Sequence, residues 1–316
     1  MAELALIIGN GFDIDLGLAS KYSDFADSPE FHDLARRMHN MYFEEERQYS
    51  LVLQIQQASF NSNWFDIEEE IHKYVVNHPC LNENIIRLVR AEFDALKKAL
   101  TAYLNRITSK FTAGEKKLST YLYDRLRECP LTVTEIYFNY TTPQQYIKLP
   151  LRQELFNGAQ HWFTYVHGSL RDNDIVLGCD LQPDEQVNRQ LSFMYKYNML
   201  KKANHVAKNI LEAKEIIFFG HSINEMDFCY FREFFKSASA APEPIRHLTI
   251  ITYDEESERN IKDNIRNQGI SVSDLYSNLR TFDFIHTKNV YAEKKEDVDK
   301  WEGMMQRIMA QDRHGL

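Results

Sequence analysis

Apolar and polar positions along the chain follow two patterns, one typical of buried strands and one typical of amphipathic helices. The first apolar run, residues 4–8, ends at Gly9-Asn10-Gly11, as a buried parallel strand does when it enters a tight turn. Comparable runs return only after Pro130. They predict strands over 132–138, 162–166, 175–177, 215–219 and 248–253.

Between residues 20 and 129 the pattern is helical, with no strand indicated. Ser28 followed by Pro29 is typical of an N-cap and the first position of a helix. The clearest apolar stripe recurs at helical spacing and consists of Ile85, Val89, Phe93, Leu96, Leu100, Leu104 and Ile107. These residues predict a large all-helical insertion.

Predicted strands alternate with helices in the remainder of the chain. The expected helices cover 185–213, 225–237, 255–266 and 295–309. This alternation predicts an α/β fold, a Rossmann-like parallel sheet with helices on both faces. We expect a nucleotide-binding domain formed by 1–19 and 130–316, interrupted by a helical insertion over 20–129.

Composition narrows the function classes. The chain has 316 residues, of which 44% are hydrophobic, and no run approaches the ~20 apolar residues that span a bilayer. The first apolar run is too short for a signal peptide, so we expect a cytoplasmic protein with no membrane partner. A formal net charge of −9 argues against broad nucleic-acid binding, which needs Lys and Arg to neutralise phosphates.

The four cysteines lie in unrelated sequence contexts and form no CxxC pair. This favours reduced, structural thiols over a zinc site, and we expect no metal.

Glycines and polar residues stand at the ends of the predicted strands, where ligands of parallel sheets bind. Gly9 and Gly11 would let backbone N–H groups approach a pyrophosphate, helped by the positive end of the next helix. Ile14 replaces the third glycine of the dinucleotide fingerprint, so a plain tight turn explains the pair equally well. The candidate ligand contacts at or near these strand ends are Gly9, Asn10, Gly11, Phe12, Asp13, Asn139, His167, Gly220, His221, Ser222, Asp227 and Asp254.

Several segments together resemble one protein family. The opening LIIGNGFDIDLGLASKYSDF resembles that of the AbiH family of bacterial abortive-infection proteins, and WFDIEEE, FNYTTP, YVHGS, LGCD and GHSINEMDFCYF follow in the family's order. The resemblance spans nearly the whole chain. It implies a role in defence against bacteriophages.

The chain is also distantly similar to sirtuin-like NAD-binding proteins. The matching positions, in the same order, are Gly9, Gly11, Gly17, Asn139, His167 with Gly168, and Gly220 to Ser222. Ala19 and Asp13 depart from the usual proline and serine, and the zinc module of protein deacylases has no counterpart. The likeness therefore implies hydrolysis of the nicotinamide–ribose bond of NAD rather than deacylation.

The resemblance implies roles for the candidate catalytic residues. Asn139 would hydrogen-bond the nicotinamide ribose or the attacking water, and His167 would be the general base, since imidazoles exchange protons near neutral pH. Such residues are otherwise often turn formers or structural. Asp13 would hold a ribose hydroxyl or the water, or would cap the helix after the glycine turn.

The later strand ends also allow two interpretations. Asp254 would accept hydrogen bonds from the adenosine ribose, or would cap the next helix. The turn 220–222 would cradle phosphate, whereas His221 and Asp227 equally fit a role in fixing the loop.

In the insertion, WFDIEEE precedes an apolar stripe of Trp64, Ile67, Ile71 and Tyr74. Glu68 and His72, like Glu69 and Lys73, are spaced as surface pairs. Alternatively, Asp66 or Glu68 reaches the ligand, or Glu68 and His72 bind a metal ion.

Three functions are compatible with these residues. We favour an NAD-hydrolysing effector of antiphage defence, with NAD as substrate or ligand. The alternatives are a noncatalytic nucleotide sensor or interaction module, and a metal-dependent nuclease or phosphodiesterase that uses Asp13, His167 and the carboxylates around Asp66. A phage-derived trigger, a partner protein and a homo-oligomer stay open.

Overall fold

The computed structural model describes residues 3–61, 66–109, 111–114, 117–143, 161–180, 189–196 and 205–310. The chain divides into two units, a sheet unit and a helical unit. The sheet unit comprises Met1–Leu18, Thr112–Val166 and Lys202–Leu316, and the helical unit comprises Ala19–Phe111 and His167–Lys201.

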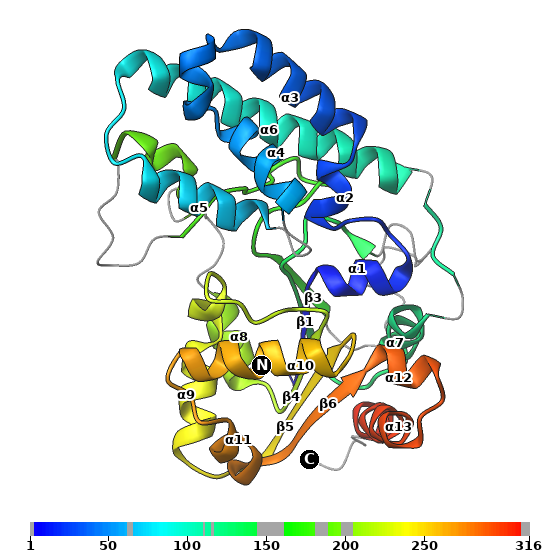
Figure 1. Ribbon diagram of the computed structural model, residues 1–316. Helices are drawn as coiled ribbons and strands as arrows, with labels where there is room; N and C mark the ends of the chain where they lie inside the picture. The colour runs from blue at the N-terminus through cyan, green and yellow to red at the C-terminus, as the bar shows by residue number, and fades with distance from the viewer. Residues whose placement is uncertain are drawn as a thin grey trace. The chain divides into compact units, whose positions relative to one another are not determined.

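The sheet unit is built on six parallel strands in the order β3-β2-β1-β4-β5-β6 (Figure 1). The strands are β1 (Leu4–Ile8), β2 (Val133–Tyr137), β3 (His161–Tyr165), β4 (Glu215–Phe219), β5 (Glu243–Thr252) and β6 (Leu279–His286). This is the Rossmann strand order, with its topological switch point between β1 and β4. The predicted fold class is confirmed.

The apolar runs predicted most of these strands but not all. β1 and β4 have the expected bounds, whereas β6 was not predicted, because its buried Phe282 and Phe284 alternate with polar residues. The strand expected over 175–177 is wrong. That segment belongs to the helical unit, where the pairing nearby is an isolated bridge between Cys179 and Tyr195.

Helices cover both faces of the sheet, as predicted. Successive residues of a strand point to opposite faces. The Phe219 ring packs against Phe12, whereas the Phe218 ring packs against Phe231 and Phe235. The helices of this unit are α1 (Asn10–Leu16), α7 (Leu118–Leu126), α8 (Val206–Glu212), η7 (Phe228–Tyr230), α9 (Arg232–Ala240), α10 (Glu255–Asn267), α11 (Val272–Asn278), α12 (Thr287–Tyr291) and α13 (Lys295–Ala310).

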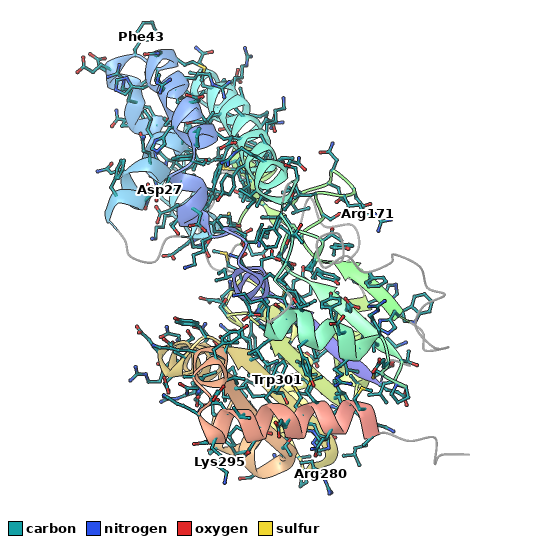
Figure 2. The ribbon with its side chains drawn as sticks, turned by 90° about the vertical axis from the view of Figure 1, so that its right-hand side faces the viewer. Asp27, Phe43, Arg171, Arg280, Lys295 and Trp301 are labelled. Carbon is teal, nitrogen blue, oxygen red and sulfur yellow. The ribbon has the colours of Figure 1, made fainter. Side chains whose placement is uncertain are left out.

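Two of the helices expected here form much as predicted. These are α10 and α13, and α13 carries the buried Trp301 (Figure 2). The Trp301 ring lies 6.2 Å from that of Tyr121 of α7. The helix expected over 225–237 is wrong at its start, because residues 225–227 form a turn before η7 and α9. The expected helix 185–213 falls partly outside the described residues; its described parts are a 3-10 turn, η4 (Arg189–Met194), and α8.

The helical unit confirms the long amphipathic helix. Its elements are α2 (Tyr22–Ala26), α3 (Pro29–Met41), η1 (Glu44–Tyr49), α4 (Leu51–Asn61), α5 (Ile67–Asn77), α6 (Glu83–Ser109) and η4. Ser28 caps α3 by accepting a hydrogen bond from the Phe31 N–H at 3.3 Å, as expected. α6 packs its buried stripe against α3 and α4.

The boundaries between the units differ from the predicted ones. Residues 112–129 belong to the sheet unit, because Tyr123 of α7 donates to Glu135 of β2 at 2.5 Å. Residues 167–201 belong to the helical unit, because the Phe193 ring packs against Phe93 and beneath the Arg90 guanidinium. In the described part of the chain, no helix is long and apolar enough to cross a membrane.

Candidate functional site

The glycine turn after β1 packs tightly on the turn after β4. The Gly9 N–H donates to the Phe219 carbonyl at 3.0 Å, and the Gly11 N–H donates to the Gly220 carbonyl at 2.9 Å. A Cβ on Gly11 would lie 2.6 Å from Gly220 Cα, a contact that backbone atoms do not tolerate. These glycines therefore allow two turns to meet. The N–H groups of Gly9 and Gly11 are thus already paired, and the approach of other backbone N–H groups to a pyrophosphate stays a prediction.

Three other residues of this segment belong to α1. Asn10 begins the helix, and Gly17 ends it at φ +97°, donating its N–H to the Asp13 and Ile14 carbonyls. Phe12 is fully buried, with its ring 4.9 Å from that of Phe219. Phe12 and Gly17 thus act as a core residue and a helix C-cap.

In the turn after β4, contacts with the neighbouring loop fix the His221 side chain. Its Nδ1 accepts a hydrogen bond from the Ile223 N–H at 2.9 Å, and its Nε2 lies 3.5 Å from Asp227 Oδ2. The ring is buried 4.4 Å from that of Phe138. This geometry supports the loop-fixing role of His221 and Asp227, while the neighbouring Ser222 is exposed.

Asp254, after β5, caps α10. Its Oδ1 accepts hydrogen bonds from the Ser257 N–H and hydroxyl, both at 3.1 Å. Its Oδ2 lies 3.8 Å from the Lys288 ammonium. Of the two predicted roles, the cap is the one that the local geometry supports.

Three residues form a buried polar cluster at the carboxyl ends of β1 and β2, which we call the sheet-edge cluster: Asp13, Asn139 and Thr141. The Phe138 N–H donates to the Ile8 carbonyl, which brings Asn139 to the same edge as the glycine turn. Asn139 Nδ2 lies 3.0 Å from both Asp13 Oδ2 and Thr141 Oγ, and the Thr141 hydroxyl also donates to Asp13 Oδ2. At most 6% of each side chain is exposed.

The sheet-edge cluster corrects one expectation for Asp13. Because α1 already begins at Asn10, Asp13 lies inside the helix and is not its N-cap. Thr141 had no assigned role in the sequence, although the motif FNYTTP contains it. Within the cluster, the buried Asn139 Oδ1 has no hydrogen-bond partner among the described residues, and neither has Oγ of the following Thr142.

His167 belongs to the helical unit and is 4% exposed. Its carbonyl accepts a hydrogen bond from the Val176 N–H at 2.8 Å, closing a loop. Inside this loop, the Ser169 N–H donates to Asp174 Oδ1 at 2.9 Å. The imidazole thus follows β3 at the start of a tightly held turn.

The helical unit contains a second group of charges, which we call the helical-unit cluster: the buried Glu68 and Lys196 and the half-buried Asp66. Lys196 is fully buried, and its ammonium donates to Glu68 Oε2 at 2.7 Å. Asp66 caps α5 by accepting from the Glu68 N–H at 2.8 Å. Burial, followed by the nearby Glu68 charge, raises the pKa of Asp66 to about 7.

The sequence predicted only part of this region. Ile67, Ile71 and Tyr74 are buried as expected, and Lys73 pairs with Glu69 at 2.8 Å. The buried partner of Glu68 was missed, because Lys196 lies far along the chain. Trp64, the other residue of the stripe, lies outside the described residues.

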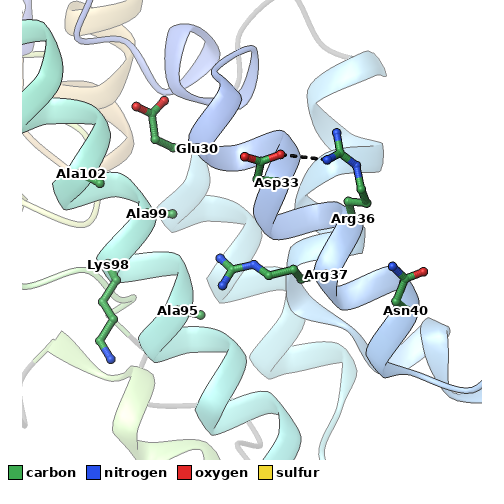
Figure 3. Close-up of a pocket in the computed structure, with 9 residues that line it drawn as sticks. All are labelled: Glu30, Asp33, Arg36, Arg37, Asn40, Ala95, Lys98, Ala99 and Ala102. Atoms are coloured by element: carbon green, nitrogen blue, oxygen red, sulfur yellow. Dashed lines mark hydrogen bonds and ion pairs between the residues drawn. The ribbon is translucent and has the colours of Figure 1, made fainter.

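A charged groove of about 650 Å³ lies between α3 and α6 (Figure 3). Ala95, Ala99 and Ala102 line it along α6, and Arg36 pairs with Asp33 at 3.0 Å. The groove contains none of the candidate residues. It therefore gives no support to the nucleotide prediction.

Among protein families, the model described as "Bacteriophage abortive infection AbiH" matches residues 5–246, well over half of the 316-residue chain. Comparison with curated proteins gives no match. The family match includes both the sheet-edge cluster and the helical-unit cluster.

Proposed function

The chain belongs to the AbiH family of bacteriophage abortive-infection proteins, and from this premise we propose that it acts by binding NAD and hydrolysing its nicotinamide–ribose bond. An antiphage abortive-infection role follows from family membership. The NAD chemistry is our proposal, and it needs a site that can orient a ribose and a water molecule.

The observation that supports this proposal is the position of the sheet-edge cluster. Ligands of doubly wound sheets bind beyond the carboxyl ends of the strands near the switch point. Asp13 follows β1, which borders that point, and Asn139 follows β2, the strand next to β1. A buried amide oxygen without a protein partner among the described residues is available there to a ligand or a water molecule.

The proposed reaction makes modest demands on the protein. The bond between ribose C1′ and the nicotinamide nitrogen breaks, both electrons leave with neutral nicotinamide, and positive charge develops on the ribose. A water oxygen then bonds to C1′ and releases a proton. Orienting the ribose and the water lowers the barrier, and buried acceptors favour the developing positive charge.

The paired glycine N–H groups limit how the rest of NAD would bind. Since Gly9 and Gly11 already donate to β4 and its turn, the pyrophosphate needs other donors. The cluster, and not the glycine turn, is therefore the part of the site on which the proposal depends.

Nicotinamide release from NAD by the purified protein tests the proposal. We expect release by the wild type and a loss of about 100-fold or more in Asn139→Ala, the usual scale for a group that stabilises a transition state. His167→Ala tests separately the base role that the sequence resemblance assigns. Asn105→Ala, an exposed change on α6, is the matched control and should keep full activity.

Two outcomes would redirect the proposal. If the wild type releases no nicotinamide, with or without infected-cell extract, but NAD raises its melting temperature, the protein is a nucleotide sensor. If NAD neither reacts nor binds, the dinucleotide assignment is wrong.

A further inference from the structure

The hydrogen bonds of the sheet-edge cluster converge on the Asp13 carboxylate. An Asn amide has two N–H donors, a Thr hydroxyl has one donor, and an ionised Asp has none. Asn139 Nδ2 donates to Asp13 Oδ2 and Thr141 Oγ, which lie close enough together to share one N–H, and the Thr141 hydroxyl donates to Asp13. The Asn139 amide nitrogen and the Thr141 hydroxyl therefore both donate toward Asp13.

This arrangement fixes the orientation of the Asn139 amide. If the amide were flipped, its oxygen would face Asp13 Oδ2 at 3.0 Å, and two acceptors would repel each other. Asn139 Oδ1 therefore stays on the side away from Asp13, buried and without a partner among the described residues. A buried acceptor of this kind costs roughly 1–3 kcal/mol, so its retention calls for an explanation.

We infer that Asp13 and Thr141 are positioning residues that hold Asn139 Oδ1 as an acceptor for a hydrogen-bond donor of the ligand, either a ribose hydroxyl or the attacking water. This inference rests on the proposed NAD chemistry and refines it. Asp13 was expected to touch the ligand; in this assignment it acts through Asn139.

The same arrangement favours a hydrogen-bond donor over phosphate as the group that binds at Asn139 Oδ1. Phosphate oxygens are acceptors and carry negative charge, and the cluster offers an acceptor beside the Asp13 carboxylate. Thr142 adds a hydroxyl that can donate or accept, and it is buried to 2% exposure. Asn139 Oδ1 therefore suits a hydrogen-bond donor, such as a ribose hydroxyl or a water molecule.

Exchanging two side chains tests this assignment, because the swap reverses every hydrogen bond in the cluster. In Asp13→Asn/Asn139→Asp, the new amide at position 13 donates to the new carboxylate at position 139 and to Thr141, and the Thr141 hydroxyl turns to that carboxylate. The second carboxylate oxygen then takes the place of Asn139 Oδ1. The swap keeps an acceptor toward the ligand.

For nicotinamide release, we expect kcat to fall by about 100-fold in Asn139→Asp, where two carboxylates face each other, and in Asp13→Asn, where the Asn139 amide is no longer fixed. The double swap should recover to within about 10-fold of wild type, with a greater effect on kcat than on KM. If the swap is no better than the worse single variant, although it melts at the wild-type temperature, the positioning role is wrong.

A second measurement needs no NAD and separates this inference from the proposed function. In protein labelled with ¹⁵N-Asn, the Asn139 side-chain amide, identified by its loss in Asn139→Asp, should exchange with solvent at least about 100-fold more slowly than that of exposed Asn105. Asp13→Asn and Thr141→Val should remove this protection. Rapid exchange in the wild type would overturn the positioning role, whereas slow exchange without NAD chemistry would overturn only the proposed function.

Discussion

The sheet-edge cluster and the helical-unit cluster differ in how completely their polar atoms find hydrogen-bond or ion-pair partners. In the helical-unit cluster a fully buried ammonium meets the carboxylate of Glu68 at 2.7 Å, a charge paired with a charge. In the sheet-edge cluster the Asp13 carboxylate accepts hydrogen bonds from neutral donors, and the amide oxygen of Asn139 has no hydrogen-bond partner among the described residues. The first arrangement suits a structural role and the second suits a role in binding, because unmatched buried groups persist mainly where function needs them.

The largest effect is expected from breaking the buried ion pair. Lys196→Met removes the ammonium from a buried carboxylate and should lower the stability of the helical unit by about 3–5 kcal/mol. Hydrogen exchange of the α5 amides measures this change. Lys73→Met removes an exposed ammonium and should cost less than about 1 kcal/mol. Equal effects of the two variants would mean that Lys196 and Glu68 are not a buried pair.

The next effect concerns the contact between the two turns beside the sheet-edge cluster. Gly11→Ala places a methyl group 2.6 Å from Gly220 Cα, so the turns must separate. We expect a loss of up to about 3 kcal/mol in unfolding free energy by urea denaturation. Gly303→Ala, in α13 with no atom within 4 Å of the new methyl group, should instead stabilise by about 0.5–1 kcal/mol. If Gly11→Ala also raised the unfolding free energy by about 0.5–1 kcal/mol, the two turns would not pack as closely as this distance requires.

A smaller stability effect is expected at the sheet-edge cluster itself. Asn139→Ala removes hydrogen bonds to Asp13 and Thr141, but it also removes the unmatched oxygen, so the net cost should be about 1 kcal/mol. Thermal unfolding measures it alongside nicotinamide release. A loss above about 3 kcal/mol would place Asn139 among residues whose main role is structural.

The smallest effect is pH-dependent and lies in the helical-unit cluster. Burial raises the pKa of Asp66 from 3.8 to about 7, so the folded state binds this proton more tightly than the unfolded state. The resulting stabilisation is complete below about pH 4 and is lost as the pH rises through 7. Asp66→Asn keeps an N-cap acceptor without titrating.

We therefore expect Asp66→Asn to match the wild type at pH 4 and to exceed it at pH 8 by on the order of 1 kcal/mol. This is below the roughly 4 kcal/mol of the full pKa shift, because Asp66 is only half-buried and solvent screens its charge. Urea denaturation at both pH values gives the comparison. A constant difference between the two proteins across this range would contradict the raised pKa.

Short-range patterns predicted the fold better than the site. Uninterrupted apolar runs indicated β1 and β4 because strands buried on both faces need apolar residues throughout. β6 was not predicted, because its apolar residues alternate with polar ones and this pattern is a weaker strand signal than an uninterrupted apolar run.

The site depends on contacts between distant residues, which periodicity does not report. Asp13 and Thr141 are separated by 128 positions, as are Glu68 and Lys196. Strand ends and motif order selected Asn139 and Asp13. The paired glycine N–H groups and the role of Thr141 emerge only when the backbone of β4 and the turn after β2 are in place.

A crystal structure with ADP-ribose, the product that retains the ribose hydroxyls, tests most directly whether Asn139 presents an oxygen to a hydroxyl or water of NAD. We predict a ribose hydroxyl or an ordered water within about 3 Å of Asn139 Oδ1, with Asn139 Nδ2 still on Asp13. A phosphate at that position, or an Asn139 amide oxygen turned toward Asp13, would contradict the proposed role of Asn139.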